Sequence, residues 1–406
     1  MMTENNQNLV PEIRFNSFTN AWEKRAWLDT VDISTNMVDP KTGYYDELPH
    51  IGPGNIESFT GILSNVRLVR EENLISSKFH FRSGDIIYGK IRPNLAKYVL
   101  IDFEGLASAD AYVLNSKNGL EQSFLYRILQ TKDFYDYSVS VSQRTGMPKI
   151  NREELNQYNF LMPCSKEQIA IGNFFRTFDD TFTLHKRKLD VLVTLKDGFL
   201  QQMFPAANEV VPRVRFAGFT GNWEERRLGE MLTERNEQFE ESEDYPLMSF
   251  VGNVGVVPKG EQYDRSFLVK GDGKKYKKTE LNDFIYSSNN LETGSIGLNR
   301  TGKAVISPVY SIFYSSNDSE SLFVGLLSKR KDFINKMIHY RQGVMYGQWR
   351  IHERDFLKII VLTPTISEQN RIIDFFKNFD EQIAAQTAKL EQLRQLKAAY
   401  LQRMFI

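Results

Sequence analysis

The sequence repeats itself at a constant offset of 201 residues, and this repeat constrains the fold more than any other feature. Shifted by that offset, residues 163–204 fall on residues 364–405 with 17 of 42 positions identical and no gap. A shorter arm repeats at the same offset, at residues 10–23 and again at 211–224. A period this long, extending over the whole chain, indicates two copies of one structural unit.

Each copy ends in a segment with one continuous heptad pattern. Apolar side chains recur at steps of four and three residues, the spacing of a helix that pairs along its length with another helix. The seam positions are Ile171, Phe175, Phe178, Leu189, Leu192 and Phe199 in the first copy, and Ile372, Phe376, Phe379, Leu390, Leu393 and Tyr400 in the second. About 40 residues without an internal proline make a rod of about 60 Å. We predict two long helices that form an intramolecular coiled coil.

Polar residues at the seam and at the helix starts refine this prediction. His185 and Gln386 occupy the same seam position, where a polar side chain usually fixes register rather than binds a ligand. Ser165 stands three residues before Gln168, and Thr365 stands three before Glu368. Both pairs have the spacing of a capping box, in which the two residues satisfy each other's backbone N–H groups.

The charges of the chain balance, with 51 Lys and Arg against 51 Asp and Glu. No global positive field attracts a polyanion, although local basic patches stay open. The single cysteine, Cys164, excludes internal disulfides. The first residues are polar and no apolar run approaches 18 residues, so we expect a soluble, cytoplasmic protein.

The segments between the arms and the long helices differ between the copies. Their shared pieces are short runs of β-branched and aromatic residues bounded by Gly, Asn and Pro, which read as strands and turns. One helix is expected in each segment, around residues 120–136 and 320–339. We therefore predict an α+β fold with two domains of mixed strands and helices. One scaffold carries two different surfaces.

Catalytic signatures are missing from the sequence. It has no nucleotide-binding glycine loop, and Gly52-Pro53-Gly54 reads as a turn. The five histidines never fall at the spacing of metal ligands, so no metal site is predicted. No Asn/Asp-Pro-Pro-aromatic loop is present, which the amino-methyltransferases that flip a base use. We expect no catalytic residue and no cofactor on this chain.

The dissimilar segments do contain loops rich in Arg, Lys, Asn and Gln, the side chains that read guanine and adenine in the major groove. Lysine clusters such as residues 274–278 more often contact phosphates. The candidate DNA-binding residues of the first segment are Lys90, Arg92, Asn94, Lys97, Gln143, Arg144, Thr145 and Lys149. Those of the second segment are Asn289, Asn290, Asn299, Arg300, Arg341, Gln342, Tyr346, Gln348 and Arg350. A solvated turn explains any one of these loops, but their recurrence in both copies favours DNA contact.

Taken together, this layout resembles the specificity (S) subunit of type I restriction-modification systems. The resemblance covers essentially the whole chain. It is carried by the Glu-Gln to Asp segments 167–179 and 368–380, by the Leu-Lys-x-x-x-Leu-Gln-x-Met-Phe helix ends, and by the Phe-x-x-Phe-Thr-x-x-Trp-Glu arms. The separate motifs are only moderately specific, whereas the duplicated architecture is highly specific.

The resemblance implies a division of the chain and a set of partners. Residues 1–163 and 211–364 would be two target-recognition domains, each reading one half of an asymmetric, bipartite site in double-stranded DNA. Residues 164–204 and 365–406 would be the conserved helices, paired antiparallel, with residues 205–210 as the linker. The helices would dock two methyltransferase (M) subunits, which bind S-adenosylmethionine, and through them restriction (R) subunits, which use ATP and Mg. A rod of about 60 Å would hold the two half-sites less than about 18 base pairs apart.

Three alternatives remain open at this point. The chain could be a duplicated coiled-coil scaffold with two protein-binding heads. It could be an enzyme with a site in one segment, although pairs such as Asp102/Glu104 and Asp283/Glu292 lack a basic partner at fixed spacing. It could also be a decoy specificity chain without functional M partners. The target sequence and the assignment of each half-site cannot be derived from this sequence.

Overall fold

The computed structural model describes residues 9–143, 146–252, 254–258, 275–291, 294–343 and 349–406. It divides into two compact units. The first unit comprises residues 1–188 and 386–406, and the second comprises residues 189–385. Both long helices cross this division, so each unit contains one part of each of them.

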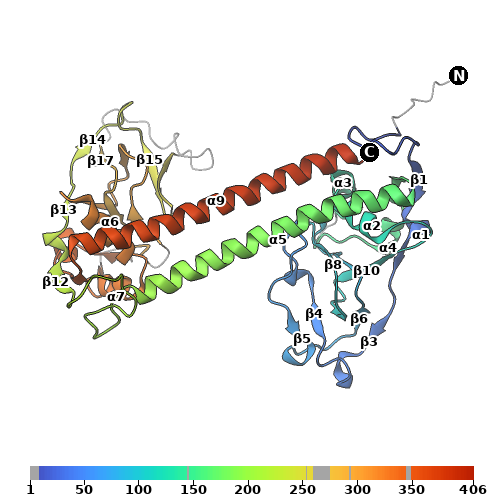
Figure 1. Cartoon of the computed structure of the whole chain (residues 1–406), viewed down its shortest axis with the longest axis horizontal. Helices are drawn as coiled ribbons and strands as arrows, with labels where there is room; N and C mark the ends of the chain where they lie inside the picture. Colours follow the sequence, from blue (N-terminus) through green and yellow to red (C-terminus); the bar gives the residue numbers. More distant parts are fainter. Residues whose placement is uncertain (1–8, 144–145, 253, 259–274, 292–293, 344–348) are drawn as a thin grey trace. The chain divides into compact units, whose positions relative to one another are not determined.

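The two predicted long helices are α5 (Ser165–Gln202) and α9 (Ile366–Met404), continuous over 38 and 39 residues (Figure 1). In the first unit, the ring of Tyr400 on α9 contacts Phe174 and Phe178 on α5, with centroids 5.1 and 5.8 Å apart. In the second unit, Phe199 near the end of α5 contacts Phe375 and Phe379 near the start of α9. The helices therefore run antiparallel in both units, and the predicted coiled-coil pairing is confirmed.

The heptad pattern does not describe the helix starts completely. Ile171 and Phe175 are 1% and 0% exposed and belong to the hydrophobic core of the first unit. Ile372 and Phe376 lie in the core of the second unit in the same way. Both ends of each helix are thus packed into a hydrophobic core, because Leu401 of α9 also belongs to the first core and Leu200 of α5 to the second.

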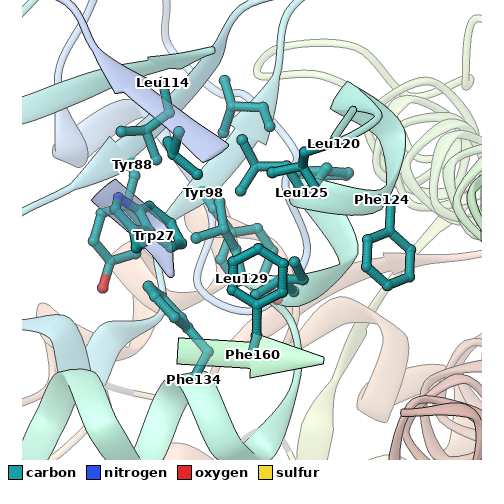
Figure 2. Close-up of a cluster of buried hydrophobic side chains, with 14 of the residues drawn as sticks. Trp27, Tyr88, Tyr98, Leu114, Leu120, Phe124, Leu125, Leu129, Phe134 and Phe160 are labelled. Atoms are coloured by element: carbon teal, nitrogen blue, oxygen red, sulfur yellow. The ribbon is translucent and has the colours of Figure 1, made fainter. Parts of the chain in front are cut away.

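The first unit contains three antiparallel or mixed sheets, with strand orders β1-β11, β2-β10-β7-β8 and β3-β6-β9-β4-β5. Its strands are β1 (Glu23–Ala26), β2 (Val31–Ile33), β3 (Met37–Val38), β4 (Pro49–Ile51), β5 (Arg67–Leu68), β6 (Lys78–Phe81), β7 (Ile86–Gly89), β8 (Tyr98–Leu100), β9 (Gly105–Ala107), β10 (Ala111–Ser116) and β11 (Asn159–Met162). Its shorter helices are α1 (Trp27–Thr30), α2 (Gln122–Ile128), α3 (Lys132–Val141) and α4 (Arg152–Asn156). The core joins strands and helices: Figure 2 shows Trp27 beside Phe134 of α3, and the two rings stack at 5.4 Å.

The second unit repeats the two-stranded and the four-stranded sheet, as β12-β24 and β13-β21-β18-β19. In place of the five-stranded sheet it has smaller ones, ordered β14-β17-β20, β15-β16 and β22-β23. Its strands are β12 (Glu224–Arg227), β13 (Thr233–Glu234), β14 (Gln238–Phe239), β15 (Met248–Val251), β16 (Gly255–Pro258), β17 (Tyr276–Thr279), β18 (Phe284–Tyr286), β19 (Ile296–Leu298), β20 (Ala304–Ile306), β21 (Ser311–Tyr314), β22 (Gln342–Gly343), β23 (Trp349–Arg350) and β24 (Ile360–Thr363). Its shorter helices are α6 (Asp318–Leu327), α7 (Lys331–Ile338) and α8 (Glu353–Phe356). The predicted α+β class with two mixed domains and two long helices is confirmed.

The single helix expected in each dissimilar segment is wrong, because each of the two predicted ranges covers parts of two helices and each segment holds at least one further short helix. Residues 120–136 span α2 and the start of α3, and residues 320–339 span α6 and α7. The chain breaks at Thr131, whose hydroxyl accepts a hydrogen bond from the backbone N–H of Phe134 and so caps α3. Apolar residues spaced four apart continue across this break, so the sequence pattern predicted one helix where the structure has two.

Among the residues that the structure describes, no helix is both long enough and apolar enough to cross a membrane.

Candidate nucleic-acid interface

In the first unit, the structure brings together two predicted DNA-binding loops that lie over 50 residues apart in sequence. Ile91 and Lys149 form an antiparallel bridge. The N–H of Arg92 donates to the carbonyl of Pro148 at 2.8 Å, and the N–H of Ile150 donates to the carbonyl of Lys90 at 3.0 Å. The loop after β7 and the loop before α4 therefore form one surface.

The side chains at this surface differ in exposure. Arg92, Asn94, Gln143 and Lys149 are exposed. Arg92 has a left-handed backbone (φ 51°), although a following proline such as Pro93 usually holds the residue before it in an extended conformation. Arg144 and Thr145, which were predicted to contact DNA from the same loop, lie outside the described residues.

Two of the predicted cations are directed inward. The Lys97 ammonium donates to the carbonyl of Pro53 at 2.5 Å and so holds a neighbouring turn. The Lys90 ammonium lies 5.5 Å from the centre of the Tyr112 ring. Burial lowers the pKa of Lys90, and the nearby charge of Lys149 lowers it further. Lys97 thus has a structural partner, whereas Lys90 belongs to a cationic group.

The sequence analysis missed two members of that group, Tyr112 and Arg152. The Arg152 guanidinium carbon lies 5.8 Å from the Tyr112 ring centre, and its nitrogens donate to the carbonyls of Ile33 and Ser34 at 2.8 and 2.6 Å. Arg152 follows Lys149 by three residues, at the start of α4. That spacing was the available signal, but the predicted loop ended at Lys149.

In the second unit, the corresponding turns also meet. The Asn289 side-chain oxygen accepts a hydrogen bond from the N–H of Trp349 at 2.7 Å, and the Ser288 hydroxyl accepts one from Ile351 at 2.9 Å. The β22-β23 pair places Gln342 opposite Arg350. The structure therefore gathers Asn289, its exposed neighbour Asn290, Arg341, Gln342 and Arg350, while Tyr346 and Gln348 lie outside the described residues.

Asn299 and Arg300 are not part of this group, because they lie at the other end of the β18-β19 pair. Asn299 is 0% exposed, and its amide bonds the hydroxyl of Thr279 and backbone groups of its own turn. Arg300 lies near Asp380 of α9, where burial lowers the pKa of its guanidinium. The geometry gives Asn299 a structural role and separates Arg300 from the gathered turns.

Charges in the second unit are largely compensated locally. The carboxylate of Glu353 lies 3.7 Å from Arg350 and 4.0 Å from Lys277, and it accepts a hydrogen bond from Ser311 at 2.8 Å. Lys278 pairs with Glu237 and Glu280. Burial alone would raise the pKa of Glu353, but hydrogen bonds from its own N–H and from Ser311, together with both cations, lower it. Two lysines of the predicted phosphate-binding cluster 274–278, Lys277 and Lys278, are therefore paired with carboxylates.

Within the described ranges, no group of three His, Cys, Asp or Glu side chains could hold a metal ion.

With this geometry in place, the chain can be compared with known proteins. Residues 40–193 and 220–395 match the family model described as "Type I restriction modification DNA specificity domain". The two matches fall in the two copies of the internal repeat and together cover most of the chain. The protein belongs to this family of specificity subunits, and the membership supports the prediction that the chain is not itself an enzyme.

Individual relatives agree with this assignment. The chain is similar to the type I restriction enzyme EcoDI specificity subunit of Escherichia coli, with 36% identity over 155 residues, or 38% of this chain and 34% of that subunit. The match thus spans about a third of the relative's length. The fold is similar to that of a type I restriction-modification S subunit from M. genitalium, with a TM-score of 0.64 at 15% identity over 98% and 99% of the two chains. A chain from a structure of a type I system has a TM-score of 0.52 at 16% identity, covering 94% and 96%.

Proposed function

We propose that this chain recognises DNA for a type I restriction-modification complex and reads an asymmetric, two-part target, one part with each recognition domain. The observation that carries the proposal is the pair of gathered turns. Both copies of one scaffold join the same two chain segments, and each copy presents different polar side chains there. Two unlike readers on related scaffolds require a target of two unlike halves, just as identical readers require a palindrome.

In the first recognition domain (1–163), we assign base contacts to exposed side chains of the gathered turns, namely Arg92, Asn94 and Gln143, with Arg144 and Thr145 in the same loop. In the second domain (211–364), the corresponding side chains are Asn289, Asn290, Arg341, Gln342 and Arg350. Arginine pairs with guanine through two hydrogen bonds, and Asn or Gln pairs with adenine in the same way. These types are therefore suited to reading base edges.

The remaining parts of the chain serve assembly in this proposal. The two long helices (164–204 and 365–406) and the linker (205–210) connect the domains and dock two M subunits, which in turn recruit R subunits. Methyl transfer from S-adenosylmethionine and the steps that use ATP and Mg take place on those partners. Long helices that pair with each other still have exposed faces available to a partner, and Leu184 and Val191 on α5 are 67% and 56% exposed.

Selection from a random double-stranded DNA library with the full chain tests the proposal. We expect enrichment of one motif with two conserved blocks separated by a gap of unconserved bases. A palindromic motif or a single block would contradict the two-reader proposal. If no DNA binds at any salt concentration, the chain is a protein scaffold and the proposed function is wrong.

A further inference from the structure

At one position of the fold, the two units carry side chains of opposite charge. The equivalence follows from the strand register: Tyr112 lies opposite Tyr88 on the neighbouring strand, and Ser311 lies opposite Tyr286 in the second unit. Arg152 opens α4 and Glu353 opens α8, 201 residues later. An arginine beside a tyrosine in the first unit is thus replaced by a glutamate beside a serine in the second.

In the first unit, this position is the centre of a group of three cations, which we call the Tyr112 cluster: Lys90, Lys149 and Arg152 around the Tyr112 ring. Lys90 and Arg152 lie 5.5 and 5.8 Å from the ring centre. The face of an aromatic ring attracts cations, so it offsets part of their mutual repulsion. Lys149 is held next to Lys90 by the bridge at Ile91.

No carboxylate neutralises the Tyr112 cluster by direct contact. Among the described residues, none of its three cations forms an ion pair within 4 Å, and Arg152 donates to two backbone carbonyls instead. Asp110 is close enough to Lys90 to raise the pKa of that lysine, but burial and the two neighbouring cations lower it more. Glu153 and Glu154 also lie near enough to raise the pKa of Tyr112, but no ion pair within 4 Å links a described carboxylate to Lys90, Lys149 or Arg152. The three cations therefore remain available to an anion at the surface that the gathered turns create.

The second unit has cations at the same place, but they are neutralised. Arg350 is the equivalent of Lys149 at the offset of 201 residues, and Ser288 stands at the position of Lys90. Glu353 lies within 4.0 Å of both Arg350 and Lys277. A carboxylate in this position repels an anion and satisfies both cations.

We infer that the Tyr112 cluster of the first unit binds a DNA phosphate, and that the second unit has no phosphate site at the equivalent position. This inference rests on the proposed function. Clustered cations without a carboxylate partner are the typical contacts of the DNA backbone, and such contacts position a protein without reading sequence. The first recognition domain would therefore supply more of the electrostatic affinity, and the second would depend more on the bases it reads.

The salt dependence of binding measures this directly, because each phosphate contact contributes about 0.9 to the slope of log K against log salt. We would compare the full chain with Lys149→Gln and Lys90→Gln, using both the selected target and random DNA. Each substitution should make the slope shallower by about one contact and weaken both DNAs by the same factor. Arg350→Gln is the comparison variant: it should weaken the selected target through the base contact proposed above, but it should change the slope less, because Glu353 already neutralises Arg350. Glu353→Gln should make the slope steeper, because it releases Arg350 and Lys277 while Ser311 can still donate to the amide oxygen.

Contrary results separate the inference from the function on which it rests. Unchanged slopes for Lys149→Gln and Lys90→Gln would overturn the phosphate site, and so would a loss confined to the selected target, which indicates base contacts. An equal change of slope for Arg350→Gln would overturn the asymmetry between the units. If the unaltered chain shows no salt-dependent DNA binding, the proposed function itself fails.

Discussion

A buried arginine–glutamate pair connects each arm to the start of a long helix. Arg14 donates to both carboxylate oxygens of Glu167 at 2.7 Å, and Arg215 makes the same contacts with Glu368. Both glutamates are 1% exposed. The arm begins each copy of the repeat and the long helix ends it. Each pair therefore connects the beginning and the end of its own copy, in the same way in both copies.

These contacts explain why the predicted capping boxes are wrong. Thr365 does accept a hydrogen bond from the N–H of Glu368, but the carboxylate of Glu368 binds Arg215 instead of capping the helix. Ser165 lies inside α5, and its hydroxyl donates to Glu121. The spacing of these residues was read correctly, but their partners lie 44 to 153 residues away in sequence, where a local pattern has no information.

Replacing Arg14 with methionine should destabilise the first unit by about 3 to 5 kcal/mol, because it leaves the Glu167 carboxylate buried without a counter-charge. Denaturant unfolding, with hydrogen exchange to locate the change at the start of α5, measures the effect. Arg215→Met is the matched variant and should act at the start of α9. The double variant Arg14→Met/Glu167→Met should recover part of the loss. A cost below about 1 kcal/mol for Arg14→Met would show that the pair contributes little.

His50 on β4 makes the stability of the first unit depend on pH. Its Nδ1 lies 2.8 Å from Glu72, and its Nε2 is buried with no hydrogen-bond partner among the described residues. Burial lowers the pKa of His50, although Glu72 opposes this effect. The folded state thus binds a proton less readily than the unfolded state, whose histidine pKa is about 6.5. Stability should be fully present above that pH and should fall as the pH drops below it.

Unfolding of the full chain between pH 7.5 and 5 tests this expectation against the variant His50→Gln. The unaltered chain should lose stability relative to the variant as the pH falls, because its histidine binds a proton more readily in the unfolded state. The glutamine of the variant does not titrate. Parallel pH profiles of the two proteins would contradict a role for His50.

At the scale of secondary structure, the long helices were predictable and the sheets were not. A seam of period 3.5 over about 40 residues specifies a helix from local information alone. The sheets depend on pairings between distant strands, such as the parallel pair of β4 with β9. The heptad reading also omitted Phe174 and Phe375, which contact the opposite helix in the two units although they precede the seam positions by one residue. Bulky rings extend beyond a narrow seam.

Polar pairs on the helices follow the symmetry of the repeat. Lys397 bonds Asp179 at 2.6 Å in the first unit, and Lys196 pairs with Asp380, the equivalent residues, in the second. His185 and Gln386, which are equivalent to each other, meet at 2.8 Å within the first unit. The contact thus joins two residues that occupy the same position in the two copies of the repeat. A register role for this pair stays a prediction.

A double-mutant cycle at His185 and Gln386 tests the register role. Each single substitution, His185→Leu or Gln386→Leu, should cost about 0.5 to 1.5 kcal/mol, because it removes a hydrogen bond between two half-buried side chains. The double variant should lose much less stability than the sum of the two single losses. Its free energy of unfolding should be close to that of the unaltered chain or above it. Denaturant unfolding monitored by far-UV circular dichroism provides the free energies. Additive losses would show that the two side chains do not interact.

At the scale of the whole chain, the repeat predicted the architecture, while the difference between the copies was only partly visible. The gathered turns were predicted as separate loops, and the structure joins them through the bridge at Ile91 in the first unit and the hydrogen bond to Asn289 in the second. Asn299 was predicted to bind DNA on its residue type alone, whereas its surroundings bury it. Side-chain type indicates what a residue could bind, but only the fold decides whether it is accessible.

Exchanging residues 1–163 for the corresponding residues of a relative with another specificity should change one half of the target and leave the other half and the gap unchanged. The reason is that the second domain and both long helices stay as they are. DNA selection with the chimera, compared with the unaltered chain and with a chimera exchanged at residues 211–364, measures this. A chimera that changes both halves would show that the domains do not read independently.

The most direct test of the central claim is single-molecule methylome sequencing of a host that produces this chain together with a type I M subunit that binds it. We predict methyladenine in one new motif that is asymmetric and interrupted by a gap of fixed length. A palindromic or ungapped motif would contradict reading by two unlike domains. No new methylation despite a folded complex with the M subunit would contradict the claim that this chain directs modification.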